Sequence, residues 1–210
     1  YEPSTIVGAT LLLDFHQAAH APQHEPHRSE LAITTAASIA NAVYEMGQQI
    51  GLVTNGRDAA DRIRTEGWDF DIRSRTAARS AGTMDDTSDR LRPIRVATNR
   101  GPEQIRRIME TLARTELTDG LTFSELVLES ISRLPRDASV IAILPRVDTE
   151  AAVTLGMLRR RGFAVTAIIN VHEQHDFAAA SGPLLAQGIE THQLRDEQAI
   201  VSVCRRVAWR

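Results

Sequence analysis

The sequence predicts an α/β domain with a doubly wound, mostly parallel sheet and helices on both of its faces. Short apolar segments alternate with longer segments of helical periodicity along most of the chain, which is typical of such sheets. The first elements form a β-α-β unit, and its right-handed crossover implies parallel pairing of the two strands. No internal repeat or domain boundary is visible, so residues 1–210 are expected to form a single domain.

The β-α-β unit lies at the start of the chain. Residues 5–15, TIVGATLLLDF, predict a buried strand because they are apolar on both faces as far as Asp14. Residues 30–47 have helical periodicity, with Ser29 as the expected N-cap and Gly47 as the expected C′ residue. Residues 49–54, QIGLVT, predict the second buried strand.

A long irregular region follows, over residues 55–93. This region and its flank as far as Arg95 contain nine arginines together with several Gly, Asp and Ser residues, and no periodicity is sustained. We expect an irregular insertion at about 55–92, mobile apart from one helical turn near residues 58–64. Residues 92–98, RPIRVAT, alternate in polarity, and Pro93 suits an edge strand better than a central one.

The second half of the chain alternates regularly between helices and strands. Pro102 suits the first turn of a helix, Thr122 with Glu125 has the spacing of a capping box, and Gly162 is a natural helix C-cap. The predicted elements are helices at 102–114 and 122–134, a strand at 138–145, a helix at 148–161, a strand at 163–170, a helix at 177–187 interrupted by Gly182-Pro183, a strand at 189–194 and a helix at 197–206.

Composition and motifs exclude several classes of function. The net charge of −3 gives no electrostatic case for nucleic-acid binding. No apolar run reaches the ~18 residues that a membrane-spanning helix needs, and the sequence contains no P-loop, G-x-G-x-x-G or G-x-S-x-G motif. Cys204 is the single cysteine and lies in the apolar segment AIVSVCRR, which predicts a buried core thiol.

The loop after the first strand concentrates four of the seven histidines. They are His16, His20, His24 and His27. Two of them could share a Zn²⁺ ion with His172 or His175. However, Pro22 and Pro26 interrupt the loop, no cysteine assists, and no carboxylate is clearly placed to orient the rings. We therefore expect a solvated polar loop, with adventitious metal binding and a true transition-metal site as the alternatives.

Three segments carry a resemblance to a known family. The segments TLLLDFH, QQIGLVTNGRDAA and LTFSELVLESISRLP resemble the MoxR-associated bacterial family of unknown function that has a von Willebrand factor A-like domain. The similarity covers nearly the whole chain and is weakest over residues 68–92. It implies a six-stranded sheet in the order 3-2-1-4-5-6.

The same resemblance implies a partner and a location. The implied partner is a MoxR-type AAA+ ATPase, in the assembly or maturation of protein complexes. Because the chain begins at Tyr1, we expect it to be part of a longer protein that carries membrane segments upstream. The intact protein would then lie on the cytoplasmic side of the bacterial inner membrane, while this segment itself is soluble and makes no membrane contact.

The resemblance also implies a metal motif, which this sequence departs from. A-domains of the integrin type use an Asp-x-Ser-x-Ser motif after the first strand, a Thr from a later loop and an Asp after the fourth strand. The residues at these positions here are Asp14, His16, Ala18, Thr122 and, after the fourth strand, Pro145 or Arg146. Asp148 follows slightly later, at the start of the next helix.

We therefore expect a degenerate metal site formed by Asp14, His16, Thr122 and Arg146, and no cofactor. Mg²⁺ prefers oxygen ligands in near-octahedral geometry. An arginine ~5 Å from the ion would oppose its binding by roughly 6–7 kcal/mol at an effective dielectric constant of ~20. Arg146 is instead a candidate to form an ion pair with Asp14 in the place of the metal.

Two functional hypotheses follow. The first is a non-enzymatic protein–protein interaction module, whose candidate partner-binding rim consists of His16, His20, Thr122, Arg146, Asp148 and His172. The alternative is an enzyme or a small-ligand or metal-binding domain that uses Asp14, His16, Thr122, Arg146 and His172. A deep pocket with perturbed titrating groups would favour the alternative, and a shallow face rimmed by loops would favour the interaction module.

Overall fold

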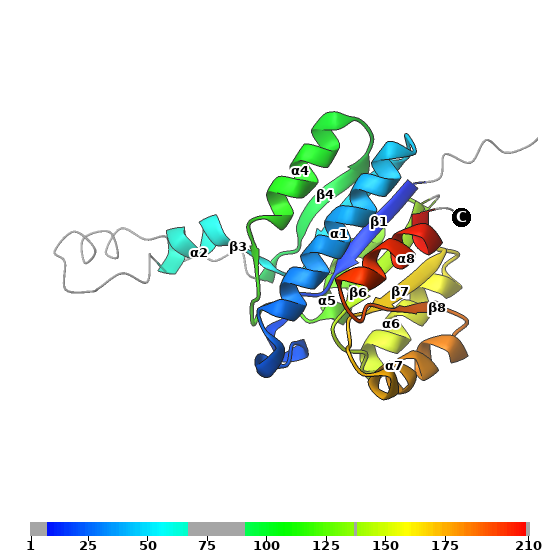
Figure 1. The fold of residues 1–210 in the computed structure, drawn as a ribbon. Coiled ribbons are helices and arrows are strands. Elements are labelled where there is room, and N and C mark those ends of the chain that lie inside the picture. Colours follow the sequence, from blue (N-terminus) through cyan, green and yellow to red (C-terminus); the bar gives the residue numbers. More distant parts are fainter. Residues whose placement is uncertain (1–7, 67–90, 137, 209–210) are drawn as a thin grey trace, which may run out of the picture.

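A six-stranded, mostly parallel sheet forms the centre of the computed structural model, which describes residues 8–66, 91–136 and 138–208 (Figure 1). Its strands are β1 (Gly8–Leu13), β2 (Gln49–Thr54), β4 (Ile94–Asn99), β6 (Ala138–Leu144), β7 (Val165–Ile169) and β8 (Glu190–Gln193). They lie in the order β4-β2-β1-β6-β7-β8, which is the expected order 3-2-1-4-5-6. All neighbours pair in parallel except β4, which is antiparallel to β2. The predicted sheet and the edge position of residues 92–98 are confirmed.

Helices cover both faces of this sheet. One face carries α1 (His27–Glu45), α4 (Pro102–Leu112) and α8 (Glu197–Ala208), and the other carries α5 (Phe123–Ser130), α6 (Thr149–Arg160) and α7 (Gln174–Ala186). Leu11 and Leu13 pack on the first face and Leu12 on the second, as the alternation of side chains along a strand requires. Each fully buried leucine contributes roughly 1.5–3 kcal/mol. No helix in the described ranges is both long and apolar enough to cross a membrane.

Two helix predictions need correction. Helix α1 begins at His27 instead of residue 30, and Ser29 is not its N-cap, because its hydroxyl donates to the Pro26 carbonyl (2.9 Å) inside the first turn. The backbone N–H of Ser29 instead donates to the carboxylate of Glu25 (3.1 Å). Helix α7 begins at Gln174 and continues through Pro183, so the predicted interruption does not occur. Gly47 has a φ of 69° after the end of α1, as expected of a C′ glycine.

The start of the predicted insertion is ordered. Helix α2 (Ala59–Glu66) extends the expected helical turn, and β3 (Arg57–Asp58) pairs with β5 (Thr115–Glu116) in a second small sheet that the sequence did not predict. An ion pair between Arg62 and Glu116 fastens α2 to β5. The expected mobility of the rest of the insertion concerns residues 67–90, which lie outside the described residues.

The cysteine is only half-buried. Cys204, on α8, packs against the core on the face of the sheet that α1 covers, and burial raises the pKa of its thiol. The prediction of a core thiol is therefore confirmed in its packing, although the side chain is not fully enclosed.

Candidate functional site

Two hollows lie side by side where the carboxyl ends of the parallel strands meet, the edge at which open α/β sheets place their ligands. The larger one, called the groove here, has a volume of about 880 Å³ and is lined by residues from 19–28, 145–147 and 170–180. The small hollow has a volume of about 190 Å³ and lies over the end of β1 and the starts of α5 and α6. Both hollows share Ala19 and Arg146.

Asp14 lies at the base of the small hollow with only 3% of its surface exposed. Its Oδ1 accepts hydrogen bonds from the backbone N–H of His16 (3.1 Å) and from Nδ2 of Asn55 (2.9 Å). Its Oδ2 accepts none from the described part of the chain. Burial raises the pKa of Asp14, although the hydrogen bonds from Asn55 and His16 and the charges of the nearby histidines lower it in part.

Asn55 is the residue that holds Asp14 in place, and the sequence analysis missed it. Its side chain also accepts from the backbone N–H of Phe15 (2.7 Å) and donates to the carbonyl of Leu121 (2.8 Å). The available signal was its position directly after β2, at the same edge of the sheet as Asp14. The expected ion pair between Asp14 and Arg146 is not formed among the described residues, because a neutral amide takes that place.

The other oxygen donors of the small hollow serve as helix caps. The hydroxyl of Thr122 accepts from the N–H of Glu125 (3.3 Å) and donates to its carboxylate (2.9 Å), which confirms the predicted capping box. Asp148 caps α6, because its Oδ1 accepts from the N–H of Ala151 (2.8 Å). Within the described ranges, Oδ2 of Asp14 and Oδ2 of Asp148 accept no hydrogen bond.

The small hollow therefore does not fit a metal ion of the integrin type. His16 and Ala18 stand where hydroxyl ligands are needed, and the guanidinium of Arg146 lines the same space. Within the described ranges, no group of three or more His, Cys, Asp or Glu side chains is placed to hold an ion, so the loop histidines do not meet His172 or His175 in a zinc site.

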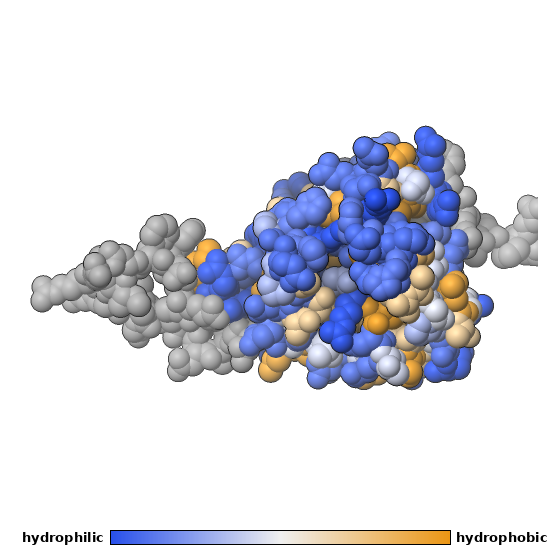
Figure 2. All heavy atoms as spheres, turned by 60° about the horizontal axis from the view of Figure 1, so that its bottom comes forward, coloured by the Kyte–Doolittle hydropathy of each residue, from blue (hydrophilic) through white to orange (hydrophobic). Residues whose placement is uncertain are grey.

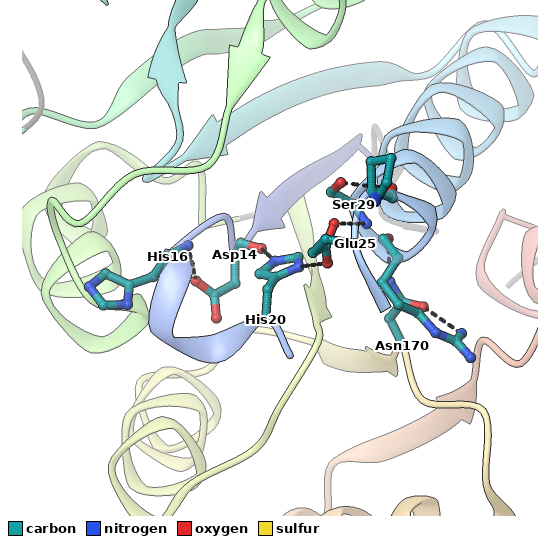
Figure 3. A network of polar contacts seen from close by, with 8 residues as sticks. Asp14, His16, His20, Glu25, Ser29 and Asn170 are labelled. Atoms are coloured by element: carbon teal, nitrogen blue, oxygen red, sulfur yellow. Dashed lines mark hydrogen bonds and ion pairs between the residues drawn. The ribbon is translucent and has the colours of Figure 1, made fainter. Parts of the chain in front are cut away.

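The histidine loop is more ordered than a solvated loop, because His20 is buried with 4% of its surface exposed. Figure 3 shows its ring between Asp14 and Glu25. Its Nε2 lies 3.2 Å from the backbone carbonyl of Asp14 and its Nδ1 lies 2.7 Å from Oε1 of Glu25. The expectation that no carboxylate orients a ring of this loop is wrong, since Glu25 does so. His20 is consequently a structural residue rather than an exposed member of the rim.

Glu25 is the acidic partner of this buried contact. Burial raises the pKa of Glu25, but hydrogen bonds from Ser29 and His20 outweigh it and lower the pKa overall. Glu25 is thus held as a carboxylate beneath the loop, in contact with Nδ1 of His20 and with the N–H of Ser29.

Arg28 and Asn170 form a second buried pair, at the floor of the groove, that the sequence analysis did not single out. Arg28 is 8% exposed, and its Nη1 donates to Oδ1 of Asn170 (3.1 Å) and to the carbonyls of Leu194 (3.4 Å) and Arg195 (3.0 Å). Asn170 donates in return to the backbone carbonyl of Arg28 (2.7 Å). Burial lowers the pKa of Arg28, while the charges of Asp196 and Glu25 partly raise it. The pair ties the start of α1 to the ends of β7 and β8.

The remaining rim residues are exposed. Arg146 lines both hollows, and His172 lines the groove beside Glu173. Figure 2 turns the side with the β1–α1 loop and α7 forward and shows hydrophilic residues around scattered hydrophobic ones. The structure thus brings His16, Thr122, Arg146 and Asp148 together around Asp14, and places His172 in the lining of the groove.

Comparison with known proteins identifies the fold but no family. No family model and no curated protein matches the chain. Among solved structures, it is similar to the pilus adhesin SpaC from Lactobacillus rhamnosus GG, with a TM-score of 0.62 and 10% identity over 97% of this chain and 30% of SpaC. It is also similar to the PilB minor pilin from Streptococcus sanguinis, with a TM-score of 0.56 and 10% identity over 97% of this chain and 60% of PilB. A mutant of PilB gives a TM-score of 0.59 at 9% identity.

Proposed function

We propose that this chain is a non-enzymatic protein–protein interaction module of the von Willebrand factor A-like type, which binds its partner at the carboxyl edge of the sheet. The observation that carries the proposal is the use of the polar groups at this edge. Asp14, Thr122 and Asp148 are engaged in hydrogen bonds that fix loops and helix ends, whereas Arg146 and His172 are exposed beside the groove. Exposed groups on a rigid edge suit recognition better than a reaction.

The similar structures support this class of function. Each spans a longer chain than this one, which covers about 30% of SpaC and about 60% of PilB. Both are named as an adhesin or a pilin and not as enzymes. By the family resemblance, the partner is a MoxR-type AAA+ ATPase, and the intact protein is held at the cytoplasmic side of the inner membrane.

We further propose that binding is independent of metal. In this proposal the site around Asp14, His16 and Thr122 is degenerate, and Arg146 supplies the positive charge that an ion provides in integrin-type domains. A charge-assisted hydrogen bond from a guanidinium to a partner carboxylate is worth ~1.5–3 kcal/mol when it is shielded from water.

The test is a binding measurement with the MoxR-type ATPase of the same organism. The charge reversal Arg146→Glu should weaken binding at least tenfold, because it removes an attraction and adds a repulsion. Arg100→Glu is the matched control, since Arg100 is an exposed arginine just after the end of β4, at the opposite edge of the sheet. Equal binding by folded Arg146→Glu, or loss of wild-type binding in EDTA, would contradict the proposal.

One observation favours the alternative function. The groove volume of about 880 Å³ falls within the roughly 300–1,000 Å³ of small-molecule sites, and Asp14 is a carboxyl group with a raised pKa nearby. An enzyme or small-ligand site would use Asp14, His16, Thr122, Arg146 and His172. Saturation of the groove by a small metabolite, with loss of binding in His172→Ala, would favour this alternative over the interaction module.

A further inference from the structure

The groove contains a buried cation whose bonding partners are all neutral. Every hydrogen bond of the Arg28 guanidinium to a described residue leaves from Nη1, so Nε and Nη2 donate to no residue there. Arg28 also forms no ion pair within the described ranges, although Asp196 and Glu25 act on it from a longer distance. A buried charge without an ionic partner is costly, and it is commonly balanced by a counter-charge.

We propose that Arg28 is an oxyanion receptor, and that the groove binds a carboxylate side chain on an acidic peptide segment of the protein partner. Nε and Nη2 lie on one edge of the guanidinium plane and can hold both oxygens of a carboxylate at once. Asn170 and the two carbonyls fix Nη1, so the ligand does not have to order this side chain when it binds. The inference rests on the proposed function and names the chemistry of the partner.

Charged side chains of both signs line the groove. Arg146 is exposed there and adds a second positive charge to that of Arg28. Three carboxylates line it as well: Glu25, Glu173 just before α7, and Asp176 in the first turn of α7. A doubly charged phosphate would meet both a stronger attraction from the arginines and a stronger repulsion from the carboxylates than a singly charged carboxylate, so competition between the two ligands must distinguish them.

The shape of the edge favours a peptide. Val147, Val171 and Ala180 give the groove apolar wall area for the side chains that flank an acidic residue. The groove also adjoins the small hollow at Ala19 and Arg146, so an extended segment has a continuous path along the edge of the sheet. A segment that crosses Arg146 would place one carboxylate at this arginine and another at Arg28.

The experiment uses fluorescein-labelled hexaglutamate as the probe, with hexaglutamine as the neutral control, and follows fluorescence anisotropy. The decisive variant is Arg28→Lys. The lysine ammonium retains donors for Asn170 and the carbonyls of Leu194 and Arg195, but it lacks the second edge that grips a carboxylate. We expect wild type to bind hexaglutamate and not hexaglutamine, and Arg28→Lys to bind at least tenfold more weakly. Arg100→Lys, the same exchange at the opposite edge of the sheet, should change nothing.

A second variant keeps the test valid if Arg28→Lys does not fold. Glu173 is exposed, and its side chain makes no capping hydrogen bond to α7. Glu173→Gln should therefore leave the fold intact and tighten hexaglutamate binding about two- to threefold. The same gain is expected in an Arg146→Gln background, where Arg28 is the remaining arginine among the described residues that line the groove, and its absence there would overturn the receptor role. Inorganic phosphate is added as competitor, and displacement of the peptide at submillimolar phosphate would assign the site to phosphate and overturn the peptide proposal.

The outcomes separate this inference from the proposed function. If hexaglutamate does not bind, or binds Arg28→Lys as well as wild type, the receptor role of Arg28 is overturned, even where the ATPase still binds through Arg146. If hexaglutamate binding depends on Arg28 but the ATPase does not bind, the receptor is supported and the identity of the partner is wrong.

Discussion

Each of the two hollows at the carboxyl edge contains a buried ionisable side chain, an acid in one and a base in the other. In the small hollow, the carboxyl group of Asp14 is held on one oxygen by the amide of Asn55 and the N–H of His16. In the groove, the cation Arg28 is held on one nitrogen by the amide of Asn170 and two carbonyls. In each case neutral groups bind one end of the ionisable group, Oδ1 of Asp14 or Nη1 of Arg28. The other atoms, Oδ2 of Asp14 and Nε and Nη2 of Arg28, form no hydrogen bond with a described residue.

Arg146 makes the two hollows unequal. It lines both of them, so its charge opposes a cation beside Asp14 and adds to the attraction of an anion toward Arg28. In the small hollow, the hydroxyl of Thr122 and Oδ1 of Asp148 are engaged as helix caps, whereas the groove is larger and has exposed donors. A buried ionisable group is therefore a candidate ligand-binding group only where the surrounding residues leave space for a ligand and carry no charge that repels it.

The largest expected effect on stability is for a substitution of Asn55, the amide that holds the carboxyl group of Asp14. Asn55 is 1% exposed and its side chain makes three hydrogen bonds. Asn55→Ala would leave the Phe15 N–H, the Leu121 carbonyl and one bond of Asp14 unsatisfied, at ~1–3 kcal/mol for each buried group. We expect a loss of about 3 kcal/mol or more in the free energy of unfolding, measured by urea denaturation. A loss below about 1 kcal/mol would show that Asp14 does not depend on this amide.

Much of the fold could be predicted because it follows from local patterns. Apolar runs such as residues 49–54 located the strands, and Thr122 with Glu125 located the start of α5 from their spacing alone. The N-cap of α1 was misplaced because a carboxylate before the helix, on Glu25, does what a serine at the cap normally does. A two-residue strand such as β3 carries no periodicity to detect.

The site was harder to predict because its contacts join distant parts of the chain. Motif positions placed Arg146 near Asp14 correctly, but a position does not state where a side chain points, and Asn55 holds Asp14 instead. The bonds of Arg28 reach residues more than 140 positions later in the chain. One available signal was a polar residue immediately after a buried strand, which describes both Asn55 and Asn170.

The stability of the folded protein should depend on pH through Glu25, which lines the groove. Its pKa in the folded protein is lower than the ordinary value of 4.5, so its stabilising effect is complete above that value and is lost as the pH falls through the folded-state pKa. Glu25→Gln should cost about 1–2 kcal/mol at pH 7, because charge-assisted bonds to His20 and Ser29 become neutral. Urea denaturation from pH 7 to pH 3 should show the two proteins converging. A constant difference would mean that Glu25 is not the anion of the pair.

The contribution of Asp14 to folding stability should have the opposite pH dependence to that of Glu25, and its substitution should change the stability less. Its pKa is raised above the ordinary value of 3.8, so its ionised form destabilises the folded state at neutral pH, and this cost disappears as the pH falls. Asp14→Asn keeps an oxygen for His16 and Asn55 and removes the charge, so we expect a gain of about 0.5–2 kcal/mol at pH 7. Thermal denaturation at pH 7 and pH 4 measures it. A destabilised variant would mean that the charge itself is needed for folding.

The smallest expected effect is the binding of metal ions to the wild-type protein. Its measurement tests whether the charge of Arg146 keeps a cation out of the small hollow. Asp14 Oδ2 accepts no hydrogen bond from a described residue, but Arg146 lines its hollow, and Thr122 and Asp148 use their oxygens as caps. Isothermal titration of the wild-type protein with Mg²⁺ or Mn²⁺ should therefore show no binding tighter than millimolar. Arg146→Asp removes the opposing charge and adds an oxygen ligand near the position where integrin-type motifs have an aspartate, so its affinity for Mn²⁺ should rise at least tenfold. Micromolar binding by wild type that is lost in Asp14→Ala would show that the small hollow is a working metal site despite its arginine. An Arg146→Asp protein that folds but gains no affinity would show that the missing hydroxyl ligands at His16 and Ala18, and not the charge of Arg146, prevent the metal from binding.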